Sequence, residues 1–128
     1  MRIIFGLLNS RLKGWVSYMT LDDVKKALLT VTDKVYHFSA PPSTNGSYIV
    51  WAEDGMVDDL SGDGEVQAQN IEGTIDYFTK NEYDATPNKI HNALNSARVG
   101  FRINSIQHEQ DTGYIHYEWV FSIPIEVL

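Results

Sequence analysis

The chain has 128 residues, of which 43% are hydrophobic, 12% aromatic and 21% charged. This is the size and composition of one globular domain, and it excludes a disordered or collagen-like chain. The absence of cysteine excludes a disulfide framework, thiolate metal sites and a cysteine nucleophile. All 17 acidic residues follow residue 18, where only seven basic residues remain, so residues 19–128 carry a formal charge of −10. Such an acidic surface repels phosphates and argues against a protein that reads nucleic-acid sequence.

The first 18 residues carry three basic residues and a short apolar run, which superficially resembles a signal peptide. The run is broken by Gly6, no small-residue cleavage site follows it, and no stretch of the chain approaches the roughly 20 apolar residues that cross a bilayer. We therefore expect residues 1–18 to be an N-terminal extension, either disordered or interface-forming. Residues 19–128 are expected to form a single domain.

The domain is expected to open with a helix over residues 20–30. Thr20 and Asp23 have the spacing of a capping box, and apolar residues then recur at helical steps. A strand over residues 34–39, ended by prolines, and a second strand over 48–52 follow. The segment from Glu53 to Glu65 holds six acids and three glycines, which predicts a mobile loop.

Alternating apolar residues predict a long strand over 71–78, and Thr86-Pro87 predicts the start of a second helix that stops at Gly100. The last thirty residues predict a hairpin that turns at 110–113, with a bulge near residues 104–105 in its first strand. The predicted fold class is α+β: a single, mostly antiparallel sheet with two helices on one face, in the order α-β-β-β-α-β-β.

Two clusters have residue types that bind metal ions. If the last hairpin is centred on Thr112, His108 and His116 lie opposite each other with Glu118 nearby, a set that could hold zinc. We expect a solvent-facing histidine pair instead. The acidic segment matches the first half of a calcium loop from Asp59, but Asn70 stands where a glutamate ligand is required. No phosphate-binding loop or catalytic motif is present, so we expect no cofactor, no metal and no enzymatic activity.

Four stretches carry a family resemblance: TLDDVKKALL, YIVWAED followed by the acidic segment, GTIDYFTKNEYDATPNKIHNAL, and GYIHYEWVFSIPIEV. Together they resemble the small tail proteins of long-tailed bacteriophages and prophages, and most of all the tail terminator, or tail-completion, group. The resemblance spans residues 19–128 and depends on length and element order, since the chain has no catalytic signature.

The resemblance implies a virion protein that forms a ring of six subunits on the head-proximal end of the tail tube. The ring ends tube polymerisation and joins the tail to the head, so its partners would be itself, the tail tube protein and a head-completion or neck protein. The resemblance also implies assembly in the bacterial host cytoplasm and DNA that passes through the lumen without specific binding, with no membrane partner. Five acidic residues are expected to face the lumen or the neighbouring ring: Asp54, Asp58, Asp59, Asp63 and Glu65.

Two alternatives stay open at the level of sequence. One is another neck, head-completion or minor tail component. The other is a monomeric, non-catalytic ligand-binding domain with no place in a virion.

Overall fold

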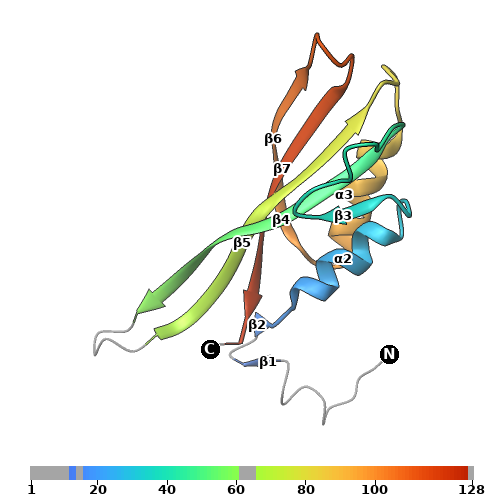
Figure 1. Ribbon diagram of the computed structural model, residues 1–128. Coiled ribbons are helices and arrows are strands. Elements are labelled where there is room, and N and C mark those ends of the chain that lie inside the picture. The colour runs from blue at the N-terminus through green and yellow to red at the C-terminus, as the bar shows by residue number, and fades with distance from the viewer. Residues whose placement is uncertain (1–11, 14–15, 61–65, 127–128) are drawn as a thin grey trace.

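The computed structural model describes residues 12–13, 16–60 and 66–126, which form one five-stranded sheet, a two-stranded hairpin and two helices (Figure 1). The elements are β1 (Leu12–Lys13), β2 (Val16–Ser17), α2 (Leu21–Leu29), β3 (Val35–His37), β4 (Tyr48–Leu60), β5 (Val66–Thr79), α3 (Thr86–Ser96), β6 (Gly100–His108) and β7 (Ile115–Ile125). From α2 onward this is the predicted α-β-β-β-α-β-β order, which confirms the α+β class. The hairpin β1–β2 precedes it and was not predicted.

The large sheet has the strand order β3-β4-β5-β7-β6. Strands β4, β5, β7 and β6 pair antiparallel, whereas β3 pairs parallel with β4 through Val35 and Ile49, so the sheet is mixed. Both helices cover the same face (Figure 1). The opposite face carries no helix from the described part of the chain.

The predicted capping box forms at the start of α2. The Thr20 backbone N–H donates to Asp23 Oδ2 at 2.8 Å, and the Asp23 N–H donates in return to Thr20 Oγ1 at 3.3 Å. Val24, Ala27 and Leu28 form the buried stripe of the helix. The predicted start of this helix is therefore confirmed to within one residue.

The predicted strand over 34–39 is shorter than expected and ends for a different reason. It runs only from Val35 to His37, because Phe38 adopts the left-handed conformation with φ = 73°. A bulky side chain rarely takes this conformation. The backbone turn at Phe38, and not the prolines that follow, ends the strand.

The predicted loop from Glu53 to Glu65 is wrong over its first eight residues. Strand β4 continues to Leu60 and pairs with β5 from Val66 onward, with a bulge between Glu53 and Gly55. The backbone bonds of the hairpin hold these polar residues in a strand although their side chains carry no apolar alternation. The remainder of the predicted loop, residues 61–65, lies outside the described residues.

Helix α3 begins at Thr86 as predicted but ends before the expected stop at Gly100. Arg98 takes the left-handed position after the helix, with φ = 64°, and the Val99 N–H closes the cap on the Leu94 carbonyl at 3.0 Å. Gly100 instead opens β6. The predicted bulge in β6 is confirmed, since the register with β7 shifts between Ile103 and Ser105.

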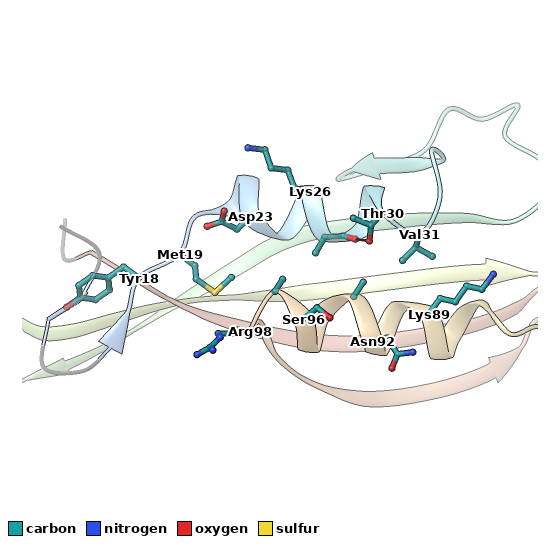
Figure 2. Close-up of a pocket in the computed structure, with 13 residues that line it drawn as sticks. Tyr18, Met19, Asp23, Lys26, Thr30, Val31, Lys89, Asn92, Ser96 and Arg98 are labelled. Atoms are coloured by element: carbon teal, nitrogen blue, oxygen red, sulfur yellow. Dashed lines mark hydrogen bonds between the residues drawn. The ribbon is translucent and has the colours of Figure 1, made fainter. Parts of the chain in front are cut away.

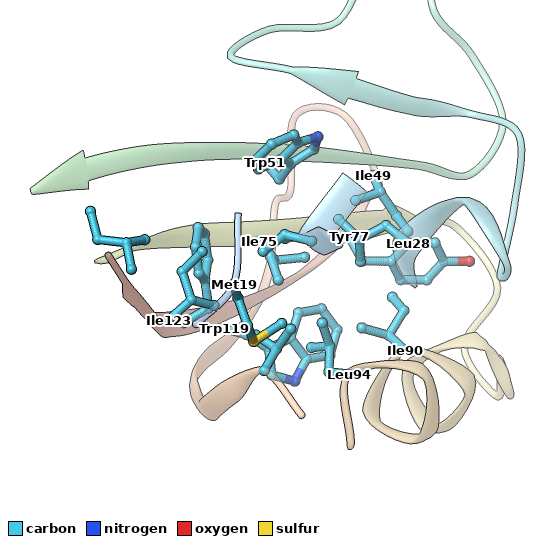
Figure 3. Close-up of a cluster of buried hydrophobic side chains, with 14 residues drawn as sticks. Met19, Leu28, Ile49, Trp51, Ile75, Tyr77, Ile90, Leu94, Trp119 and Ile123 are labelled. Carbon is cyan, nitrogen blue, oxygen red and sulfur yellow. The ribbon is translucent and has the colours of Figure 1, made fainter. Parts of the chain in front are cut away.

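The hydrophobic core lies between the two helices and the covered face of the sheet (Figure 3). The largest fully buried side chains are Trp119, Tyr77, Leu28, Ile49, Ile75, Ile90, Leu94 and Ile123. Met19 belongs to this core, and its N–H donates to the Pro124 carbonyl at 2.7 Å. The core therefore ties the segment before α2 to the end of β7.

Candidate functional site

The β4–β5 hairpin extends well beyond the rest of the sheet (Figure 1). Strand β3 pairs with β4 only from Ile49 to Trp51, and β7 pairs with β5 only from Gln69 onward. We call the part of the hairpin beyond the bulge, residues 53–60 and 66–72, the acidic arm. Its β4 edge has no partner strand among the described residues, so its backbone N–H and C=O groups are available to another chain.

The arm is acidic and partly apolar. Asp54, Asp58 and Glu72 are exposed, and Met56 and Val57 remain 49% and 44% exposed between the two aspartates. No Lys or Arg occurs anywhere between Lys34 and Lys80. Carboxylates beside exposed apolar groups on an unpaired strand are typical of a surface that contacts another protein.

The structure brings together part of the predicted acidic set. Asp54 and Asp58 lie exposed on the same strand of the arm, and Asp59 follows them on that strand. Asp63 and Glu65 lie outside the described residues. Sequence reasoning missed Glu72, which pairs with Gly55 across the hairpin. Glu72 lies in the polar phase of the strand predicted over residues 71–78, and this position could have indicated that it is exposed.

At the base of the arm, Glu53 is held by His37. Their Oε1 and Nε2 atoms lie 2.6 Å apart, and the His37 ring stacks on Trp51 with centroids 4.0 Å apart. Burial alone would raise the pKa of the Glu53 carboxyl, but the hydrogen bond from His37, a backbone hydrogen bond and the charge of His37 together outweigh it and lower that pKa. Because this acid is already paired, it is less available to a partner than Asp54 or Asp58.

The other edge of the sheet is β6. Ile103 and Ile106 are 42% and 60% exposed on this strand, and Arg102 is its only charged residue apart from a terminal histidine. Monomeric proteins protect such edges with lysine, proline or a covering segment. Neither lysine nor proline occurs in β6, and its protection is limited to the bulge between Ile103 and Ser105. The two exposed isoleucines make this edge a second candidate contact surface.

The uncovered face of the sheet carries a cluster of aromatic side chains that sequence reasoning did not assemble. The ring of Phe78 stacks on Tyr48 at 4.9 Å and on His116 at 4.3 Å, and Tyr114 packs edge-on against Phe78 at 6.2 Å. These residues come from three strands and the turn before β7. They stiffen the sheet on the side that no helix supports.

The predicted opposition of His108 and His116 is wrong. The hairpin register pairs Gln107 with His116 and His108 with Ile115, so the two histidines point to opposite faces of the sheet. His116 instead lies 2.7 Å from the Asp76 carboxylate, which is on the neighbouring strand. Across the described ranges, no group of three His, Asp or Glu side chains is placed to hold a metal ion.

Comparison with known proteins gives distant structural likenesses. No family model matches the chain, and no curated protein matches it. Its structure is similar to a chain of an extracellular contractile injection system, described as the PVC sheath/tube terminator in its extended state. The two are 13% identical with a TM-score of 0.45, and the match covers 88% of this chain but 58% of the other. At that level the likeness assigns no function.

No helix within the described ranges is both long and apolar enough to span a membrane.

Proposed function

We propose that this chain is a structural subunit of a phage tail or tail-like particle. In this proposal, several copies form a ring on the head-proximal end of the tail tube. The ring ends polymerisation of the tube and joins it to the head. The single observation that carries the proposal is the acidic arm, a projecting hairpin with an unpaired β4 edge, exposed apolar side chains and no basic residue.

The arm supports assembly because one projecting element per subunit gives a heterologous contact. Such a contact joins two different surfaces and generates rings when the rotation between neighbours closes. The arm points away from both helices (Figure 1), so it cannot fold back onto the helical layer of its own chain. A ring would give each arm a neighbour to contact.

The two remaining features suit the other tasks of a terminator. Residues 19–128 carry a formal charge of −10, and a negative surface lets DNA pass without adhering. The edge of β6 exposes Ile103 and Ile106, which makes it suited to a partner that is not repelled by charge, such as the last ring of the tube. The arm and the β6 edge lie on different strands, so a subunit could use both at once.

The proposal is tested by deletion of the gene for this chain from its phage or prophage genome. Electron microscopy of the particles should show tails of excessive or irregular length that are not joined to heads. Expression of the wild-type chain in trans should restore both length and joining. Free tails of normal length would assign the chain to head completion instead, and normal infectious particles would contradict any role in the virion.

A further inference from the structure

A groove of about 910 Å³ runs between α2 and α3 (Figure 2). Its floor is made of small or apolar side chains, Ala27, Val31, Ala93 and Ala97. Because these residues are small, the two helices leave room between them for side chains from another chain.

The rim of the groove carries three basic residues and one acidic residue, Asp23, although the protein is strongly acidic. Lys26, Lys89 and Arg98 line it, and they are three of only seven basic residues in 19–128. The Lys26 side chain pairs with Asp22 at 2.9 Å but is 73% exposed. The side chains of Lys89 and Arg98 make no hydrogen bond or ion pair with any other residue that the structure describes. Within the described ranges, Lys89 and Arg98 therefore have no ion-pair partner, and Asp23 is the one acidic residue that lines the groove with them.

The backbone at Arg98 adds a second observation. Its φ of 64° is the left-handed conformation that glycine favours at the end of a helix, and a side chain there costs stability. The chain nevertheless carries an arginine at this position, directly at the mouth of the groove. Residues kept in a disfavoured conformation concentrate at functional sites.

We propose that the groove between α2 and α3 receives the acidic arm of a second copy of this chain. The arm matches the groove in charge and in polarity: Asp54 and Asp58 would meet the basic rim, and the exposed Met56, which shares a face of the strand with Asp58, would cover the apolar floor. Each copy has one arm and one groove, so the contact is heterologous and repeats around a ring. This inference deepens the proposed function, on which it rests, and assigns Asp54 and Asp58 to a subunit contact instead of the lumen.

Two charge-reversed variants test the contact. Asp54→Lys/Asp58→Lys alters only the arm, and Lys26→Glu/Lys89→Glu alters only the groove. Wild-type protein should assemble with rising concentration in light scattering and analytical ultracentrifugation, and less so at high salt. Each variant alone should associate roughly tenfold more weakly, or not at all. An equimolar mixture should form a heterodimer and then recover larger assemblies, because opposite charges meet at both contacts. The acidic arm of the second variant fits the basic groove of the first, and the lysines on the arm of the first variant face the glutamates in the groove of the second.

Matched controls separate this contact from net charge. Asp33→Lys/Glu82→Lys and Lys34→Glu/Lys80→Glu change the charge equally at exposed positions outside both surfaces, and they should assemble like the wild type. Arg98→Gly should raise the midpoint of thermal unfolding while it weakens association. If Arg98→Gly instead lowered both the midpoint of unfolding and the association, the role of Arg98 would be purely structural. That result would count against the proposal.

Several results would overturn the inference. The first is a wild-type chain that stays monomeric at millimolar concentration. The second is a mixture of the two variants that yields no heterodimer. The third is a groove that binds inorganic phosphate although charge reversal of the groove leaves assembly unchanged. Failure of the proposed function can be distinguished from failure of this contact. If deletion disturbs tail length but the heterodimer does not form, the terminator role stands and this contact falls. If the heterodimer forms but tails are normal, the contact stands and the terminator role falls.

Discussion

The ring of Phe121 lies directly over the backbone of Gly73 on the neighbouring strand. A Cβ at Gly73 would lie 2.7 Å from Phe121 Cε2 and from the Cα of Glu53, and closer still to the Ala52 carbonyl oxygen. Phe121 is 2% exposed, so its ring cannot move aside without opening the core. The absence of a side chain at Gly73 therefore lets three strands approach where the acidic arm begins.

Replacement of Gly73 by alanine should accordingly destabilise the fold. We expect the free energy of unfolding in urea to fall by about 1–3 kcal/mol, because the backbone contacts leave no flexible group to yield. Gly55→Ala is the matched control, since a Cβ there meets nothing within 4 Å. It should change the free energy by less than about 0.5 kcal/mol. Equal effects of the two substitutions would contradict the proposed crowding at Gly73.

Asp84 links β5 to the start of α3 and should give the fold part of its acid sensitivity. Its carboxylate accepts hydrogen bonds from the Tyr77 hydroxyl at 2.5 Å, the Thr79 hydroxyl at 2.8 Å and the Thr86 N–H at 2.8 Å. Burial alone would raise the pKa of Asp84, but these hydrogen bonds outweigh it and lower the pKa from 3.8 to about 2. The stability that Asp84 adds is present above pH 3.8 and is lost as the pH falls through about 2.

We therefore expect Asp84→Asn to lower the free energy of unfolding by about 1–3 kcal/mol at neutral pH. The difference from wild type should shrink below pH 3.8 and vanish near pH 2, as measured by urea unfolding across that range. A difference that does not depend on pH would show that the charge of Asp84 is not what stabilises the helix start.

Asp76, on the uncovered face, should behave in the opposite way. Burial raises the pKa of its carboxyl above 3.8, Glu118 raises it further, and the hydrogen bond with His116 only partly offsets these effects. A raised pKa in the folded state favours the protonated form, so the contribution of Asp76 to stability falls as the pH rises above 3.8.

Asp76→Asn keeps an oxygen acceptor for His116 and removes the buried charge. We expect the variant to be equal to wild type or up to about 1 kcal/mol more stable at neutral pH. NMR titration of Asp76 in a Glu118→Gln variant gives an independent check, because removal of the neighbouring charge should lower the pKa of Asp76. An unchanged pKa would exclude the influence of Glu118.

Trp119 is fully buried, and its indole N–H donates to His91 Nε2 at 2.6 Å. His91→Leu should cost about 1–3 kcal/mol in unfolding experiments, because the buried indole N–H then has no acceptor. His91→Gln can supply an oxygen and should recover part of that loss. If both substitutions cost the same, the packing of the His91 ring matters more than the hydrogen bond.

Local patterns predicted the elements whose boundaries are set by local chemistry. The capping box at Thr20 fixes the start of α2, and the change of phase between Ile103 and Ile106 revealed the bulge in β6. The stop of α3 was misplaced because Arg98, and not Gly100, adopts the left-handed conformation. Sequence alone does not reveal that a disfavoured residue has been kept at such a position.

The candidate surfaces were harder to predict because they depend on pairing between distant segments. The arm lacks apolar alternation, so only the backbone bonds between β4 and β5 identify it as a strand. Lys26 and Lys89 share a groove only because α2 and α3 pack side by side on one face of the sheet. The position of His116 depends on the hairpin register. His116 pairs with Gln107 and not with His108, and this difference of one residue places the two histidines on opposite faces of the sheet.

The exposed edge of β6 gives the last prediction. Ile103→Lys/Ile106→Lys places two charges on a strand whose isoleucines already face solvent, so the free energy of unfolding should change by less than about 1 kcal/mol. If this edge contacts the tail tube, the variant should still form the arm-to-groove assembly in solution but should fail to restore normal tail length in the deletion strain. Lysine on an edge strand blocks the approach of another strand, which gives the physical reason for that failure. A variant that restores normal tails would instead exclude β6 from the contact with the tube.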